Sequence, residues 1–184
     1  MITIINCGSN KTPQIASCVS SAGYENQVIT IEKSHLLPAN TTGIVVSGAP
    51  ILLTEVDPQG YLEKLAFLKN TTVPALGICF GHQIIGLLHG ATIKRGKEDR
   101  VNREIEILEE SILLKGLSDK FYLREDHCEE INLPINFTHI AKSSHTKVEI
   151  MQHITQPLYG IQAHPEVSSE IGQRIINNFC SLCN

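Results

Sequence analysis

Several features that would assign a chain to a class of protein are missing from these 184 residues. No apolar run reaches about 18 residues, the length of a membrane-spanning helix, so we expect no membrane partner. The formal net charge is −4 and no stretch is dense in lysine and arginine, which argues against nucleic acid as a partner. The opening MITIIN has neither the basic region nor the cleavage site of a signal peptide, so we expect a cytoplasmic protein.

The spacing of cysteines that holds a metal ion is also missing. Of six cysteines, only Cys180 and Cys183 form a Cys-x-x-Cys pair, and no second pair of ligands accompanies them. In the cytosol such thiols stay mostly reduced. We therefore predict no metal site, and we expect no cofactor.

What is present is the composition of an ordinary globular protein, with 42% apolar and 18% charged residues. The length suits a single domain over residues 1–184, because a chain of this size buries a sizeable core. In the first half, apolar runs alternate with amphipathic stretches. The predicted strands there are 2–6, 27–31, 43–47 and 73–78, and the predicted helices are 11–22, 59–70 and 80–89.

The second half is richer in predicted strands, and it ends in a helix over about 168–181 with Ser168 or Ser169 as its N-cap. These further strands are 91–94, 103–108, 120–123, 137–142, 147–151 and 158–162. Solidly apolar strands that alternate with helices are typical of a parallel sheet covered on both faces. We therefore predict an α/β fold in which helices flank a central, mostly parallel or mixed sheet.

The stretch PALGICFGHQIIGLLHG, residues 74–90, places Cys79 where a buried strand meets a helix. Gly77 and Gly81 allow a sharp turn and a close approach of other groups. This arrangement is typical of a nucleophile elbow, with cysteine in the place of serine. A helix N-terminus and a neighbouring histidine would both favour the thiolate. The alternative is that Cys79 is a small buried hydrophobic residue.

A base for this thiol is found in PLYGIQAHPEV, residues 157–167. His164 follows an apolar strand, and Glu166 lies two residues on, where in extended chain both side chains point to one side. The carboxylate could then orient the imidazole, as in a catalytic triad. His127 with Glu129 is a rival pair in a polar, loop-like setting, which we rank lower. We expect a structural role for His82.

The segments GICFGHQ and HPE together resemble the class I (triad) glutamine amidotransferases, and the resemblance covers nearly the whole chain. It implies a flavodoxin-like fold in which Cys79 attacks the side-chain amide of L-glutamine, His164 transfers the proton and Glu166 orients His164. GIVVSGAP, residues 43–50, is similar to the family's oxyanion strand. The resemblance implies further site residues around the substrate, namely Gly48, the backbone N–H groups of Ala49 and Phe80, and the side chain of Gln83.

Among the subfamilies, length and layout are most similar to the free-standing amidotransferase subunits of GMP synthases. The chain has neither a Gly-x-x-x-x-Gly-Lys-Ser/Thr loop nor the Ser-Gly-Gly-x-Asp-Ser loop of ATP pyrophosphatases. We therefore expect a separate ATP-dependent synthetase chain to receive the ammonia. Two alternatives remain open: a self-sufficient γ-glutamyl hydrolase, and a non-catalytic regulatory relative. The second arises because Ala49 stands where relatives usually carry the second glycine of Ser-Gly-Gly-Pro.

Overall fold

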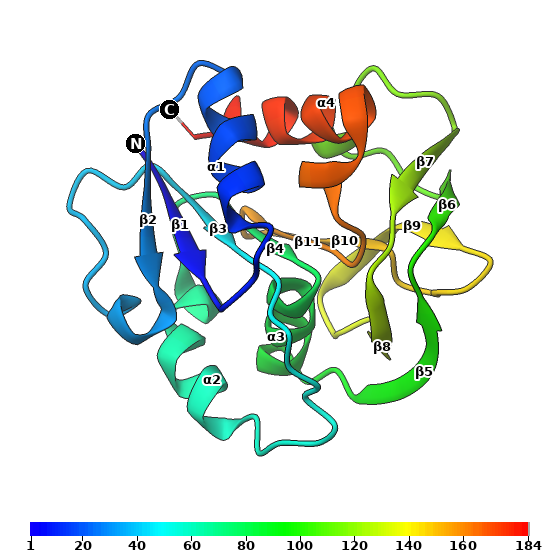
Figure 1. Ribbon diagram of the computed structural model, residues 1–184, viewed down its shortest axis with the longest axis horizontal. Helices are drawn as coiled ribbons and strands as arrows, with labels where there is room; N and C mark the ends of the chain where they lie inside the picture. Colours follow the sequence, from blue (N-terminus) through cyan, green and yellow to red (C-terminus); the bar gives the residue numbers. More distant parts are fainter. Residues whose placement is uncertain (184) are drawn as a thin grey trace.

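The computed structural model describes residues 1–183, and the last residue of the predicted domain 1–184 lies outside the described residues. Strands and helices alternate in the first half of the chain, and strands dominate the second (Figure 1). The strands are β1 (Ile2–Asn6), β2 (Asn26–Thr30), β3 (Gly43–Val46), β4 (Ala75–Ile78), β5 (Ile93–Asp99), β6 (Asn102–Ile107), β7 (Lys120–Arg124), β8 (His127–Ile131), β9 (Phe137–Ser143), β10 (Ile150–His153) and β11 (Leu158–Ile161). The helices are α1 (Thr12–Ser21), α2 (Gln59–Leu65), α3 (Phe80–Leu88) and α4 (Ser169–Cys180), with short 3₁₀ turns η1 (Ile31–Lys33), η2 (Ala66–Asn70), η3 (Ile112–Leu114) and η4 (Pro165–Val167).

A mixed sheet of nine strands forms the centre of the molecule, in the order β2-β1-β3-β4-β11-β10-β9-β6-β7. The first five strands in this order pair in parallel, and the remaining pairs are antiparallel. Strands β5 and β8 form a separate antiparallel ribbon. The predicted α/β fold with helices flanking a mixed central sheet is confirmed.

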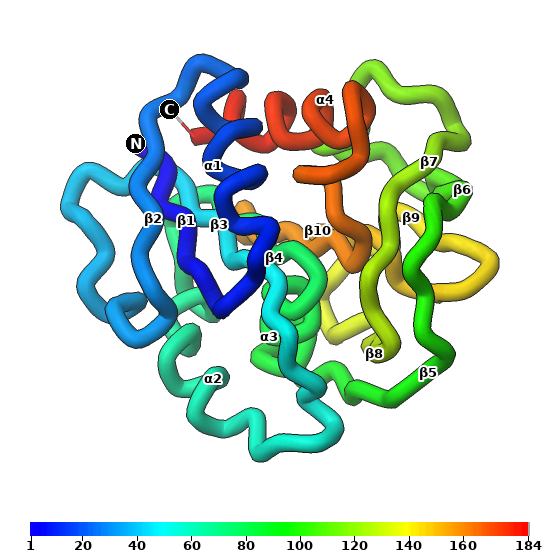
Figure 2. Tube along the Cα trace, in the orientation of Figure 1, coloured from blue at the N-terminus to red at the C-terminus, as the bar shows by residue number. Residues whose placement is uncertain are grey.

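Two pairs of helices cover the two faces of this sheet. Helices α1 and α4 pack together on one face, and α2 and α3 pack together on the other (Figures 1 and 2). Each face has its own apolar core, with Ile15 and Phe179 in the first and Leu65 and Ile84 in the second. All four residues in each of β3, β4 and β11 are buried, as strands covered on both faces require. Within residues 1–183, no helix combines the length and apolarity needed to cross a bilayer.

Three local features differ from the sequence-based expectation. Residues 127–131, expected as polar loop, form strand β8, because its charged side chains find partners instead of facing water. The helix predicted over 59–70 ends at Leu65 and continues as a 3₁₀ turn. Ser168 occupies the N-cap position of α4, but its hydroxyl donates to the His164 carbonyl oxygen and makes no capping hydrogen bond.

Candidate active site

Cys79 stands on a sharp corner between strand β4 and helix α3. Its backbone has φ 52° and ψ −104°, a region that side-chain-bearing residues rarely occupy. The glycines on either side are required for close packing, since a β-carbon at Gly77 would lie 2.4 Å from the Gly81 carbonyl carbon, and one at Gly81 would lie 2.4 Å from the Val46 carbonyl oxygen. The expected nucleophile elbow is thus present, with the thiol at the N-terminus of α3.

His164 and Glu166 lie beside this corner because β11 is the parallel neighbour of β4. His164 Nδ1 donates a hydrogen bond to Glu166 Oε1 over 2.7 Å, and both side chains are buried. The sequence predicts extended chain here, but residues Pro165–Val167 form the 3₁₀ turn η4. This turn brings the carboxylate to the imidazole and leaves Nε2 free to face the thiol.

The imidazole of His164 is in hydrogen-bond contact with the thiol of Cys79. Burial lowers the pKa of His164, but hydrogen bonds to Cys79 and Glu166 and the charges of both groups outweigh it and raise the pKa to about 10. A carboxylate and a developing thiolate therefore stabilise the imidazolium form. Gly48 packs against the pair, because a β-carbon at this position would lie 3.2 Å from His164 Cε1 and 3.7 Å from Cys79 Cβ.

The pair opens into a cavity of about 530 Å³. Cys79, which is only 7% exposed, His164, Phe80, Ala49 and Gln83 all line this cavity. Within the described part of the chain, the backbone N–H groups of Phe80 and Ala49 make no hydrogen bond, so both are available to an oxyanion. Of the residues expected to act on glutamine, these five line the cavity, whereas Glu166 lies behind His164 and Gly48 packs beside the pair.

Comparison with protein families matches residues 3–182 to Glutamine amidotransferase class-I. The chain belongs to the class I glutamine amidotransferase family. It is 38% identical to a glutamine-hydrolysing GMP synthase subunit from Pyrococcus abyssi, over 100% of this chain and 98% of that one. It is 35% identical to the protein of the same name from Pyrococcus furiosus, with the same coverage. The crystal structure of a GMP synthase subunit from Thermoplasma acidophilum superimposes with a TM-score of 0.90, at 28% identity, over 99% of this chain and 92% of that chain.

Two other histidines of this class I amidotransferase, His127 and His82, take no part in the triad. His127 Nε2 lies 3.2 Å from Glu125 Oε2, whereas the carboxylate of Glu129 accepts hydrogen bonds from the backbone N–H groups of Leu53 (2.9 Å) and Thr54 (2.7 Å). The rival pair His127 and Glu129 therefore does not form a base with its orienting carboxylate. His82 is fully buried in α3, and burial lowers its pKa to about 3, which fits the structural role expected of it.

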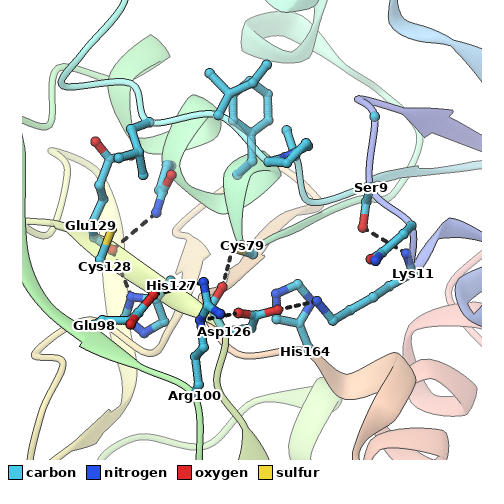
Figure 3. A pocket seen from close by; sticks show the side chains of 18 of the residues that line it. Ser9, Lys11, Cys79, Glu98, Arg100, Asp126, His127, Cys128, Glu129 and His164 are labelled. Atoms are coloured by element: carbon cyan, nitrogen blue, oxygen red, sulfur yellow. Dashed lines mark hydrogen bonds and ion pairs between the residues drawn. The ribbon is translucent and has the colours of Figure 1, made fainter.

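Charged residues lie at the mouth of the cavity, and no sequence motif predicts them there. Asp126, between β7 and β8, pairs with Lys11 from the segment before α1 and with Arg100 from the β5–β6 turn, whose Nε lies 3.3 Å from Asp126 Oδ1 (Figure 3). Partial burial raises the pKa of Asp126, but Lys11, His164 and Arg100 outweigh it and hold the pKa below its usual value. The carbonyl oxygen of Asp126 lies 4.0 Å from Cys79 Sγ. Three segments distant in sequence thus meet over the thiol.

Among residues 1–183, no group of three or more His, Cys, Asp and Glu side chains is arranged to hold a metal ion. All six cysteines lie within residues 1–183 and none of them is in a disulfide; Cys180 and Cys183 are both buried.

Proposed function

We propose that this chain hydrolyses L-glutamine to glutamate and ammonia, with Cys79 as the nucleophile. The observation that carries the proposal is the contact of Cys79 with His164, itself oriented by Glu166, on the wall of a cavity large enough for an amino acid. The relatives at 35–38% identity, named as glutamine-hydrolysing GMP synthase subunits, support the same reaction.

In the first half of the reaction, Cys79 Sγ attacks the side-chain amide carbon of glutamine. The carbonyl oxygen of the substrate becomes an oxyanion, which the N–H groups of Phe80 and Ala49 are available to bind. His164 donates its proton to the amide nitrogen, the C–N bond breaks and ammonia leaves. The product of this step is a γ-glutamyl thioester on Cys79.

In the second half, water attacks the thioester carbon while His164, now neutral, accepts the water's proton. The C–S bond breaks, glutamate leaves and the thiolate–imidazolium pair forms again. Glu166 stabilises the imidazolium in this cycle and holds the ring in its orientation. Gln83, which lines the cavity one turn into α3, is proposed to contact the substrate glutamine, as is the backbone at Gly48.

The ammonia is proposed to pass to a separate ATP-dependent synthetase of the GMP synthase type. The names of the relatives support such a partner. Glutamine hydrolysis is useful to a cell only where the ammonia is captured, and the sequence has no recognisable ATP-binding loop of its own. A cytoplasmic location, supported by the six free thiols, belongs to the same proposal.

The test is a glutaminase assay with and without a candidate ATP pyrophosphatase chain, ATP and xanthosine monophosphate. We expect glutamate release that increases when the synthetase and its substrates are present, and no release by Cys79→Ser. Glutaminase activity that no synthetase alters would contradict the partnership. Faster hydrolysis of a γ-glutamyl peptide than of glutamine would favour the γ-glutamyl hydrolase instead. A folded protein whose Cys79 does not react with a glutamine-mimicking diazo-ketone would favour the non-catalytic relative.

A further inference from the structure

A buried amide reaches the nucleophile from the strand that carries the base. Gln162 comes directly after β11, two residues before His164, and its side chain is fully buried. Its Nε2 lies 3.7 Å from Cys79 Sγ, and its Oε1 lies 3.2 Å from Gln83 Nε2. Gln162 thus bridges the reacting sulfur and a residue of the proposed glutamine site.

We propose that Gln162 is a further catalytic residue, whose side-chain amide donates a hydrogen bond to the Cys79 thiolate and sets its reactivity. This inference rests on the proposed function, because it assigns Gln162 a part in the same reaction.

The orientation of the Gln162 amide follows from the chain of hydrogen bonds behind it. Gln83 Nε2 lies 3.2 Å from the backbone carbonyl oxygen of Glu129, which can only accept. The Gln83 amide must therefore present its NH₂ group to Glu129, and this same NH₂ group faces Gln162 Oε1. Gln162 is left with its own NH₂ group toward the sulfur. The direction of donation is thus fixed by a carbonyl that has no proton to give.

Further hydrogen bonds hold both ends of this series, at Glu129 and at Gln162, and so fix the orientation of the Gln162 amide. The carboxylate of Glu129 accepts from the backbone N–H groups of Leu53 and Thr54, and its carbonyl oxygen lies 3.0 Å from His127 Nδ1. The backbone N–H of Gln162 donates to the Glu149 carbonyl oxygen over 2.8 Å. Both ends of the bridge are therefore held by backbone hydrogen bonds.

The surroundings of Cys79 Sγ explain why a hydrogen-bond donor would stabilise its thiolate. The Cys79 thiol is in direct contact with the imidazole of His164, with Glu166 behind it, and the charges of Asp126, Lys11 and Arg100 lie at the cavity mouth. The carbonyl oxygen of Asp126, 4.0 Å away, accepts from the thiol but repels a thiolate. The Gln162 amide offsets that repulsion, because a hydrogen bond to an anion is stronger than one to a neutral group.

The decisive experiment measures the alkylation of Cys79 by iodoacetamide as a function of pH, followed by mass spectrometry of the peptide that contains Cys79. The principal variant, Gln162→Glu, keeps the shape of the side chain but turns a carboxylate oxygen toward the sulfur. We expect its alkylation at pH 7 to be slower by about tenfold or more, with the midpoint of the pH profile moved upward. Gln162→Met, of similar volume and uncharged, should lie between Gln162→Glu and the wild type. Gln27→Glu, on the exposed edge strand β2, should match the wild type.

The result that overturns the inference is a folded Gln162→Glu protein whose alkylation profile is that of the wild type. Should Gln162→Glu not fold, the same measurement on Gln162→Met decides, and an unchanged midpoint there overturns the inference. A merely structural Gln162 would lower the unfolding midpoint without moving the pH profile. Because alkylation needs no glutamine, a wild type that alkylates normally but releases no glutamate contradicts the proposed function and leaves the Gln162 result to be judged by itself.

Discussion

At the residue that carries the thiol, the backbone adopts a conformation that suits glycine better than cysteine. The φ of 52° and ψ of −104° at Cys79 carry strain of about 1–3 kcal/mol. We predict that Cys79→Gly is more stable than Cys79→Ala by about 1 kcal/mol, the reverse of the order in regular structure. Urea denaturation of the two variants measures this difference. Equal midpoints, or a more stable alanine variant, would show that the elbow is unstrained.

The imidazole of His164 gives a second prediction, on the pH dependence of glutamine hydrolysis. Burial lowers its pKa, but Cys79 and Glu166 outweigh it and raise the pKa to about 10. The ring therefore stays protonated above neutral pH, and activity should persist until it falls as the pH approaches about 10. At low pH the activity should rise as the thiolate–imidazolium pair forms. The acid and alkaline limbs of the pH profile therefore both report on the Cys79–His164 pair and not on one residue alone.

In the Glu166→Gln variant, the alkaline fall should move to lower pH, because the carboxylate that stabilises the imidazolium is gone. Glu170→Gln, an exposed change in the first turn of α4, serves as the control and should leave the profile unchanged. A wild-type profile that already falls near pH 7 would show that the imidazolium lacks this stabilisation.

The sequence allowed some of these residues to be predicted and not others. Cys79 and His164 stand in short motifs whose glycine, proline and acidic neighbours mark them. Gln162 could have been found from the alternation of an extended strand, since it lies two residues before His164 and so on the same side. The pairing of Lys11 with Asp126 joins residues 115 positions apart and leaves no local pattern.

At the scale of elements, strands buried on both faces were easier to predict than partly polar ones. Strands β3, β4 and β11 are apolar throughout, and their predicted positions agree with the structure within two residues. Strand β8 reads HCEEI, and its buried Glu129 is stabilised by backbone donors from the loop 53–54, a contact that no periodicity reveals. Polar strands are thus specified by distant partners, and apolar ones by their own residues.

Lys11 joins the segment before α1 to the turn between β7 and β8 across the cavity mouth, and this gives the third prediction. Lys11, before α1, pairs with Asp126, whose carbonyl oxygen lies beside Cys79 Sγ. A partly exposed ion pair contributes up to about 1 kcal/mol, so Lys11→Met should raise the KM for glutamine by up to about fivefold, with little change in kcat. Steady-state kinetics measure this split.

Lys120→Met is the matched control, because Lys120 on β7 pairs with Glu104 on β6 and both side chains are exposed. Its kinetics should equal those of the wild type. High salt should raise the KM of the wild type toward that of Lys11→Met and change the KM of the variant less, since salt screens the Lys11–Asp126 pair that the variant lacks. A KM for Lys11→Met equal to that of the wild type would mean that the pair does not order the cavity wall.

At the scale of the whole molecule, the two halves of the mixed sheet form different walls of the site. The parallel half supplies Cys79 and His164 from the ends of neighbouring strands, as is usual in α/β proteins. The antiparallel half and the β5–β8 ribbon supply the opposite wall, including Asp126 and Glu129. The alternation of strands and helices predicted the first half well. The second half depends on buried polar contacts between strands, which composition does not indicate.

One such contact makes the stability of the whole fold depend on pH. Glu149, before β10, is fully buried, and its burial together with the charge of Glu125 raises its pKa from about 4.5 to about 8. Between these values the folded protein binds more protons at this site than the unfolded chain does, so stability should fall as the pH rises from about 4.5 to 8. Glu149→Gln removes this dependence. We predict a flatter profile and a gain on the order of a few kcal/mol at pH 8, measured by urea denaturation across the range. Exposed Glu109→Gln should follow the wild type, and a Glu149→Gln profile as steep as the wild type's would place the pH dependence elsewhere in the molecule.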